Sequence, residues 1–132
     1  MTMPETAHHD DVELRLPADF GSLPVVRGVA ATVAMGVDLP LDQVSDLRLA
    51  VDEVCSQVIA LARRGAELTC LFRVSGADIV VTAWAPSATG RLPSPESFGW
   101  HVLCTLTDDA RTWQGGGSDR AVHVEVRKHR NV

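Results

Sequence analysis

The sequence predicts an α+β protein, a two-layer sandwich in which helices lie on one face of a mixed, mostly antiparallel sheet. Two segments, residues 21–38 and 41–65, carry apolar residues at helical spacing. Two further pairs of apolar or alternating segments are each separated by a short turn, which is typical of antiparallel hairpins. The helices and strands are grouped and the strands are mostly linked as hairpins, so the sequence favours α+β over a parallel α/β sheet.

The length and charge of the chain limit what it can be. Its 132 residues suffice for one domain, which we expect to span residues 11–128 after a disordered N-terminus at residues 1–10. The net charge of −5, from 12 basic and 17 acidic residues, argues against direct, nonspecific nucleic-acid binding. No run reaches about 18 consecutive apolar residues, and the N-terminus lacks the basic start and apolar run of a signal peptide. We therefore expect a cytoplasmic protein without a membrane segment.

A strand and a helix come first in chain order. Residues 12–16 alternate between apolar and charged side chains, as in a half-buried strand, and Pro17 ends the strand. Ser22 is the predicted N-cap of the helix at residues 21–38, with Pro24 at an early helical position. Arg27 is the only charged residue in the body of this helix. It is either a surface arginine whose stem packs along the helix or a residue with a function of its own.

The segment 41–65 is the longest periodic stretch and organises the chain. Its apolar stripe consists of Val44, Leu47, Val51, Val54, Cys55, Val58 and Ala62. Glu53 and Gln57 lie four residues apart on another flank, so their side chains are neighbours. A solvated face is the plain interpretation of that pair. We expect Arg63, Arg64 and Gly65 to close the helix with cations in its last turn and a glycine cap.

Two hairpins and a third helix complete the prediction. Residues 68–74 and 79–84 form the first hairpin around a turn at 75–78. A loop at 85–95 leads to a helix at 96–109. We assign the apolar face of that helix to Phe98, Val102, Leu103 and Leu106. The second hairpin turns at residues 115–117 and ends in a strand at 121–126, and we expect the basic tail after it to fray.

The sequence offers little sign of other chemistry. It contains no GxxxxGK[ST] motif, which excludes the P-loop class of nucleotide-binding proteins. No Ser-His-Asp arrangement can be inferred from the spacing of its residues. Cys55, Cys70 and Cys104 lie far apart in apolar runs, without a CxxC motif, so we expect buried free thiols.

The segment LRLAVDEVCSQVIALA resembles the first nucleotide-binding box of the GHKL (Bergerat-fold) ATPases. More narrowly, it is similar to the RsbW/SpoIIAB group of bacterial anti-sigma factors, which are also serine kinases. Together with FGWHVLCTLTDD, it looks closest to an actinobacterial subgroup of the UsfX type. The resemblance covers nearly the whole chain. It implies the histidine-kinase-like ATPase fold, with nucleotide held between the long helix and the loop.

The resemblance also implies roles for particular residues. Glu53 matches the family's general base or water-positioning residue, and Gln57 stands where an asparagine holds Mg²⁺ on the nucleotide phosphates. Ala83 stands where an aspartate binds adenine, and Gly90 is the only glycine left near that box. Gly99 is the one glycine retained from the later box. A buried adenine donor left without an acceptor costs about 1–3 kcal/mol, so we expect binding of ATP and Mg²⁺ to be weak or lost.

Three functions follow as hypotheses. The first is an anti-sigma factor that sequesters an alternative sigma factor of the stress or sporulation type and is antagonised by a STAS anti-anti-sigma factor. The resemblance implies that Arg27 contacts both partners and that its helix lies near a homodimer interface. The second is an active Mg-ATP-dependent serine kinase that phosphorylates the antagonist, with Glu53 as base. The third is a domain that kept the scaffold for another protein contact.

Overall fold

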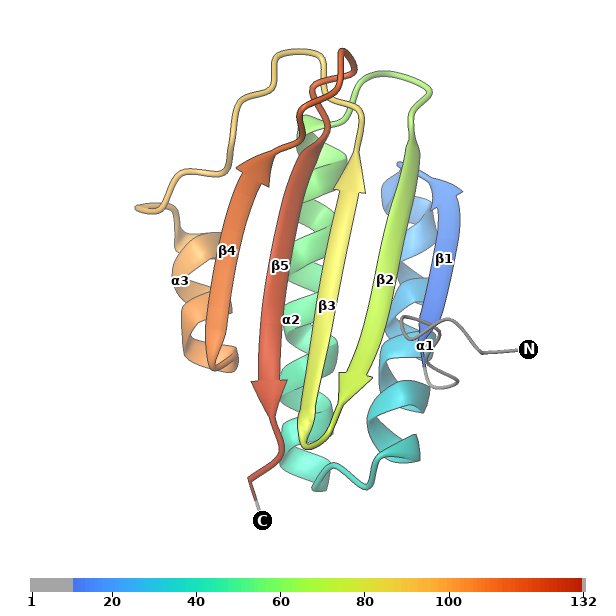
Figure 1. Ribbon diagram of the computed structural model, residues 1–132, viewed down its shortest axis with the longest axis vertical. Helices are drawn as coiled ribbons and strands as arrows, with labels where there is room; N and C mark the ends of the chain where they lie inside the picture. The colour runs from blue at the N-terminus through green and yellow to red at the C-terminus, as the bar shows by residue number, and fades with distance from the viewer. Residues whose placement is uncertain (1–10, 132) are drawn as a thin grey trace, which may run out of the picture.

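The structure is a computed structural model that describes residues 11–131. The disorder expected at residues 1–10 therefore lies outside the described residues. Within them the elements are β1 (Val12–Pro17), a short 3-10 helix η1 (Phe20–Ser22), α1 (Leu23–Gly36), α2 (Leu41–Leu61), β2 (Glu67–Ser75), β3 (Asp78–Ala85), α3 (Phe98–Leu106), β4 (Asp109–Gln114) and β5 (Val122–His129) (Figure 1).

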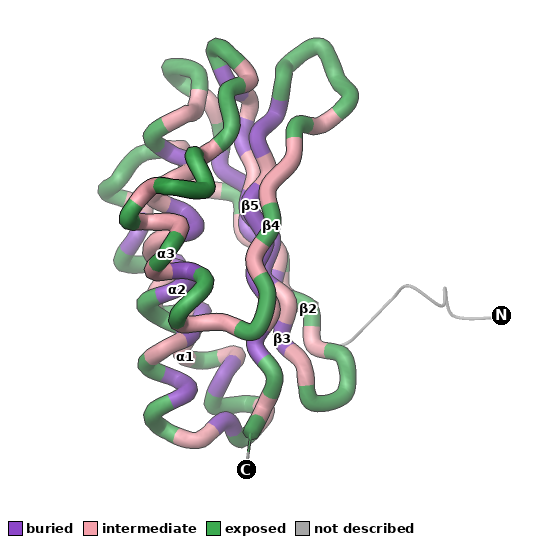
Figure 2. The backbone as a smooth tube through the Cα atoms, turned by 90° about the vertical axis from the view of Figure 1, so that its left-hand side faces the viewer, coloured by how far each residue is buried: buried purple, intermediate pink, exposed green. Residues whose placement is uncertain are grey.

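The strands form one five-stranded sheet in the order β1-β2-β3-β5-β4. Each neighbouring pair in that order is antiparallel, so the described sheet lacks the parallel component of the mixed sheet expected from the sequence. The helices cover one face of the sheet (Figures 1 and 2). The predicted α+β two-layer sandwich is thus confirmed. The hairpins β2–β3 and β4–β5 are joined by pairing of β3 with β5, and the segment that contains α3 connects them.

The core lies between the sheet and α2, whose predicted apolar stripe faces the strands. Leu47, Val51 and Val54 on α2 are fully buried, as are Phe72 on β2 and Val124 on β5. Burying each such side chain contributes about 1.5–3 kcal/mol, so α2 is held firmly along its length. The helix is therefore a rigid support for the polar residues on its other flank.

Both long helices are shorter than their periodicity predicts. Ser22 precedes α1 as expected, but its hydroxyl donates to the carbonyl of Pro17 at 2.9 Å instead of capping the helix. α2 ends at Leu61, because Ala62 takes an extended conformation and forms a bridge with Ser87. The predicted closure of α2 by Arg63, Arg64 and Gly65 is thus wrong. Gly65 lies in the following turn, with φ +76°.

The third helix and the C-terminal strand also correct the prediction. Phe98, expected on the apolar face of this helix, is 83% exposed, and Cys104 is exposed on α3 instead of buried. The expectation that the basic tail frays is wrong for its first residues, because β5 continues to His129. Lys128 is buried, and its ammonium group donates to the carbonyl of Leu106 at 3.0 Å.

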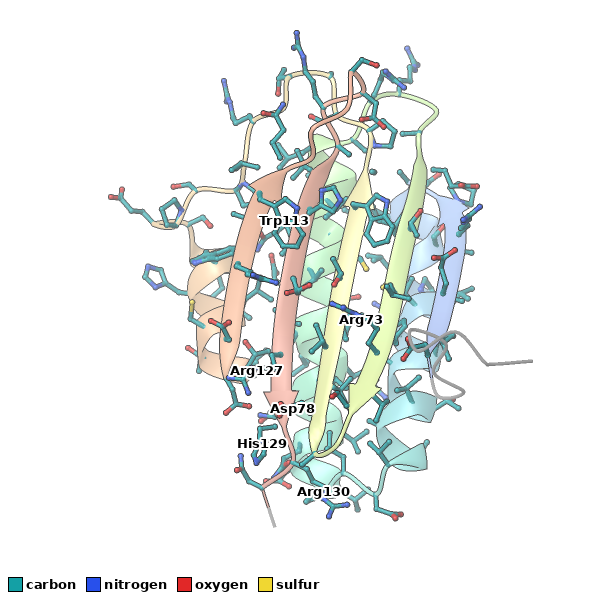
Figure 3. All side chains as sticks on the ribbon, viewed as in Figure 1. Arg73, Asp78, Trp113, Arg127, His129 and Arg130 are labelled. Atoms are coloured by element: carbon teal, nitrogen blue, oxygen red, sulfur yellow. The ribbon has the colours of Figure 1, made fainter. Side chains whose placement is uncertain are left out.

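No described helix covers the opposite face of the sheet, which carries a row of stacked rings (Figure 3). The His123 ring lies between those of Trp84 and Trp113, with centroid distances of 5.4 and 5.0 Å. Partial burial between the indoles lowers the pKa of His123. The guanidinium of Arg111 lies over the Trp113 ring, 5.2 Å from its centroid.

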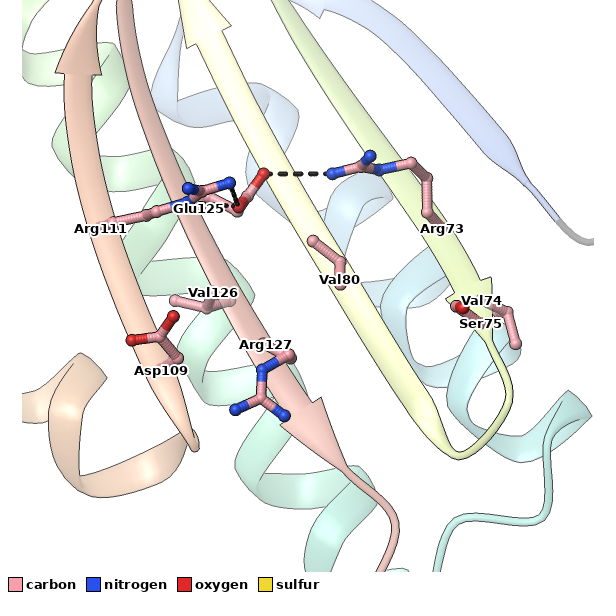
Figure 4. Close-up of a pocket in the computed structure, with 9 residues that line it drawn as sticks. All are labelled: Arg73, Val74, Ser75, Val80, Asp109, Arg111, Glu125, Val126 and Arg127. Atoms are coloured by element: carbon pink, nitrogen blue, oxygen red, sulfur yellow. Dashed lines mark hydrogen bonds and ion pairs between the residues drawn. The ribbon is translucent and has the colours of Figure 1, made fainter. Parts of the chain in front are cut away.

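Beside these rings, the carboxylate of Glu125 is the centre of a polar network in a depression of about 370 Å³ (Figure 4). The side chain of Glu125 is only 9% exposed. It accepts hydrogen bonds from Thr82 at 2.6 Å, Arg73 at 3.1 Å and Arg111 at 2.7 Å. These bonds offset the desolvation of the carboxylate, so the network fixes the register of β2, β3, β4 and β5 on this face.

Candidate functional site

The pair predicted on α2 is formed. Glu53 and Gln57 occupy successive turns, and the amide nitrogen of Gln57 donates to Oε2 of Glu53 at 2.9 Å. Because the other side of α2 is buried against the sheet, both side chains are directed away from it. The helix thus presents a carboxylate held by an amide.

The first turn of α3 brings Gly99 against this pair. A Cβ atom added to Gly99 would overlap Oε2 of Glu53 and lie 2.9 Å from Nε2 of Gln57. The absence of a side chain at Gly99 therefore lets α3 approach α2 closely. The helix is capped by the hydroxyl of Ser97, which accepts from the backbone N–H of Trp100 at 3.2 Å. Three of the residues predicted for the site, Glu53, Gln57 and Gly99, thus lie together.

A cleft of about 290 Å³ opens beside these residues. Glu53, Gln57 and Gly99 line it together with Leu61 and Ser94. The amide oxygen of Gln57 is buried and has no hydrogen-bond partner among the described residues. A buried, unpaired oxygen is an unfavourable arrangement that a water molecule or a cation would relieve.

The other two residues predicted for nucleotide binding lie elsewhere. Ala83 is fully buried within β3, between Cys70 on β2 and Val124 on β5. Gly90 has φ +73°, and a Cβ atom there would overlap the side chain of Gln114. Neither residue lines the cleft of Glu53 and Gln57.

The start of the loop after β3 is tied to the end of α2. The N–H of Arg63 donates to the carbonyl of Pro86 at 2.8 Å, next to the bridge between Ala62 and Ser87. The hydroxyl of Ser87, which is buried, accepts from the N–H of Gly90 at 3.0 Å. These bonds hold the loop against the helix end.

The residues present fit a magnesium nucleotide poorly. The unpaired oxygen of Gln57 has the chemistry of a magnesium ligand, and Glu53 supplies a carboxylate nearby. However, Ala83 stands where the resemblance implies an adenine-binding carboxylate, and its methyl group is buried between neighbouring strands. The serine cap of α3 also uses one of the N–H groups that a helix N-terminus offers to phosphate.

Arg27 is placed by an ion pair between the first two helices. Its Nη1 lies 2.8 Å from Oδ1 of Asp52, the residue before Glu53. The two side chains remain 42% and 31% exposed. Arg27 is thus part of the packing of α1 on α2 and is still accessible to a partner.

The sheet, the helices on one of its faces and the cluster of Glu53, Gln57 and Gly99 are consistent with a protein of GHKL-like fold. No protein-family model matches the chain. It is 39% identical over 105 residues to proteins named anti-sigma-F factor RsbW from two strains of Mycobacterium tuberculosis, CDC 1551 / Oshkosh and ATCC 25618 / H37Rv. The aligned region covers 80% of this chain and 62% of each relative, so the chain spans less than two thirds of their length.

The fold has a counterpart among solved structures. The chain superposes with a TM-score of 0.72 on the crystal structure of the RsbU and RsbW domains of Rv1364c from Mycobacterium tuberculosis. The match covers 90% of this chain and 32% of that one, at 10% sequence identity, so it supports the fold alone. The identity to the relatives confirms the resemblance to RsbW-type anti-sigma factors predicted from the sequence, and the solved structure confirms the fold.

Sequence reasoning missed a second hollow on the other side of Glu53. A groove of about 440 Å³ lies between α2 and α3, lined by Leu49, Asp52 and Glu53 on α2 and by Phe98 and Val102 among others on α3. The helical spacing of the lining residues on α3 is visible in the sequence. It predicts an apolar face for this helix, but periodicity alone does not say which of two apolar faces is buried.

None of the described helices is both long and apolar enough to cross a membrane.

Proposed function

We propose that this chain is an anti-sigma factor, which binds an alternative sigma factor of the sigma-F type and keeps it from RNA polymerase. The observation that carries the proposal is the 39% identity to relatives named anti-sigma-F factor RsbW, over 80% of this chain. The shared fold of the solved RsbU–RsbW structure supports it. Sequestration needs only a stable surface, which a helical layer supported by a well-packed sheet supplies.

The proposal includes the partners expected from the sequence. A STAS-type anti-anti-sigma factor would release the sigma factor by competing for the same surface, and the chain would act as a homodimer in the cytoplasm. Arg27 supports a shared contact surface, because it is accessible on the helical layer while its ion pair with Asp52 holds it in place. Preorganisation of this kind lowers the conformational entropy lost on binding.

We also propose that binding of ATP and Mg²⁺ is weak or lost, so that the protein regulates by stoichiometric binding. The enclosed methyl group of Ala83 supports this proposal, since it offers no acceptor to an adenine amino group. The position of Gly90 supports it as well, because that glycine lies against Gln114 and not beside Glu53.

A direct experiment tests the anti-sigma role. The chain would be mixed with purified sigma-F of Mycobacterium tuberculosis, the factor named by its relatives, and binding would be measured by calorimetry. Transcription from a sigma-F promoter would be followed in the same mixtures. We expect a complex and a loss of transcription that depends on the amount of chain added. A chain that neither binds sigma-F nor reduces transcription would contradict the proposal.

A second candidate function is the serine kinase, favoured by the carboxylate of Glu53 beside the unpaired oxygen of Gln57. Thermal unfolding with and without millimolar Mg-ATP and Mg-ADP tests whether the chain binds nucleotide, as a kinase must. A ligand at 100 times its dissociation constant adds about 2.7 kcal/mol and raises the midpoint by several degrees. We expect no such shift. A clear shift, followed by phosphate transfer to a STAS protein that Glu53→Ala abolishes, would establish the kinase instead.

A further inference from the structure

The groove between α2 and α3 is bordered by exposed apolar side chains. Phe98 at the start of α3 is 83% exposed, and Leu49 on α2 is 57% exposed. The lining residues on α3 recur at helical spacing along the whole element. Phe98, Val102 and Leu106 are apolar, and the two residues between them in the lining are His101 and Thr105. At a rise of 1.5 Å per residue, a helix of this length gives a groove of roughly 13 Å, enough for about two turns of a partner helix.

The groove is also selective for charge. Asp52 and Glu53 line it together with His101, and no lysine or arginine does so in the described part of the chain. Asp52 is already paired with Arg27 at 2.8 Å, so it adds little free charge to the groove. Glu53 forms no ion pair with any residue in the range 11–131, although it accepts a hydrogen bond from Gln57. The remaining unpaired carboxylate lies beside the apolar groove, within a chain of net charge −5.

From these observations we propose that the α2–α3 groove is the docking site for one amphipathic helix of the sigma factor, with an apolar row that contacts Phe98 and Leu49 and a lysine or arginine that pairs with Glu53. The inference rests on the proposed anti-sigma function and names the surface that performs it. A helix laid in a groove buries its apolar residues at positions i, i+3, i+4 and i+7. Phe98, Val102 and Leu106, spaced four residues apart, form an apolar row on α3 for such a helix to pack against. The partner's cation supplies the charge complementarity that fixes its direction.

The site shares Glu53 with the smaller cleft on the other side of Gly99. A helix in the groove would therefore occupy one flank of Glu53 while Gln57 holds the other. The contact does not require nucleotide, which agrees with regulation by stoichiometric binding.

The test uses the full chain and sigma-F of Mycobacterium tuberculosis, with binding measured by calorimetry. Phe98→Ala and Leu49→Ser should each weaken binding about tenfold, as expected for apolar anchors of an interface. Because both side chains are largely exposed, neither variant should lower the unfolding midpoint appreciably. Leu41→Ser is the matched control, since Leu41 is a large apolar residue at the start of α2 that is 81% exposed outside the groove. Its affinity should stay within about twofold of the wild type.

The charge is tested separately. Glu53→Gln should weaken binding severalfold and flatten the dependence of affinity on salt, because one ion pair is lost. Peptides of about 20 residues that tile the sigma factor identify the helix itself. The peptide that binds the wild type should carry an apolar row with lysine or arginine beside it, and Phe98→Ala should weaken its binding.

Each outcome decides a different question. Equal binding of sigma-F by the wild type, Phe98→Ala and Leu49→Ser would overturn the docking site while the anti-sigma function stands. Failure of the wild type to bind sigma-F would overturn the proposed function and this inference with it. Loss of binding to a STAS protein in Phe98→Ala, with sigma-F binding intact, would assign the groove to the antagonist and overturn the sigma-factor helix as its occupant.

Discussion

Arg27 on α1 and Asp52 on α2 form an ion pair with 2.8 Å between Nη1 and Oδ1, so the arginine expected to contact partners also joins two helices. A loss of binding after Arg27 is changed would therefore have two explanations. The arginine either contacts the partner itself or holds α1 against α2. The two explanations can be separated because Asp52 can be changed while Arg27 is kept.

Arg27→Ala and Asp52→Asn should lower the free energy of unfolding by similar amounts of about 0–1 kcal/mol, because the pair is partly exposed. Only Arg27→Ala should weaken sigma-F binding strongly, by about tenfold, since it removes the accessible guanidinium. Urea unfolding and calorimetry measure the two effects. Equal losses of binding in both variants would show that Arg27 acts through its pair with Asp52, which also lines the α2–α3 groove, and not as a contact of its own.

Gly99 and Glu53 should be energetically coupled. In a helix, alanine is favoured over glycine by up to about 1 kcal/mol. In the wild type this gain is offset, because the new methyl group displaces the Glu53 carboxylate. Gly99→Ala should therefore be more favourable in a Glu53→Ala background than in the wild type, by about 1 kcal/mol in a double-mutant cycle. Additive effects would mean that α3 does not approach α2 as closely as described.

Glu125 should contribute more to stability than either arginine that it binds. Glu125→Ala removes a buried acceptor from three donors and should lower the free energy of unfolding by about 1–3 kcal/mol. Arg111→Ala should cost about 0–1 kcal/mol, because that side chain is 65% exposed and Glu125 keeps Arg73 and Thr82. Glu13→Ala is the control, since its pair with Arg15 is exposed and should have almost no effect. A loss for Glu125→Ala as small as that control would contradict the network's role.

The cysteines should differ in reactivity towards a thiol reagent in the native state. Cys104 is exposed and should react at once, whereas Cys55 and Cys70 are buried with their sulfurs 4.0 Å apart and should react only on unfolding. The hydrogen bond to Cys70, together with burial, raises the pKa of Cys55. Cys55 therefore loses its proton at a lower pH in the unfolded chain than in the folded chain. The free energy of unfolding should thus fall as the pH rises above about 8.5, and it should fall less steeply in Cys55→Ala. Three native thiols of equal reactivity would contradict this arrangement.

The sequence predicted what depends on local pattern. The alternation of β1 and the apolar stripe of α2 led directly to their observed positions, because one face of each is buried. The pairing of Arg27 with Asp52 could not be predicted, since it joins residues 25 positions apart. The expected packing of Phe98 and burial of Cys104 are wrong because α3 is apolar on more than one face, and only its packing on α2 selects which face is buried.

Some residues of the candidate site could also be placed from the sequence, and others could not. The neighbourhood of Glu53 and Gln57 followed from helical spacing, and the position of Gly99 beside them followed from the resemblance. The location of Gly90 did not follow from either. It depends on how the loop after β3 meets the turn between β4 and β5, which local pattern does not encode.

The chain order of the sheet has a consequence for how this protein can change over evolution. The loop after β3 and α3 form an insertion between two hairpins that pair with each other directly. Each doubling in the length of such a loop costs only about 0.6 kcal/mol in closure entropy. The loop in this insertion can therefore change in length while the sheet beneath it persists, whereas Gly99 and Leu103 of α3 are constrained by close packing. A protein with this fold can therefore lose the binding of one ligand and keep a second binding surface while it stays folded.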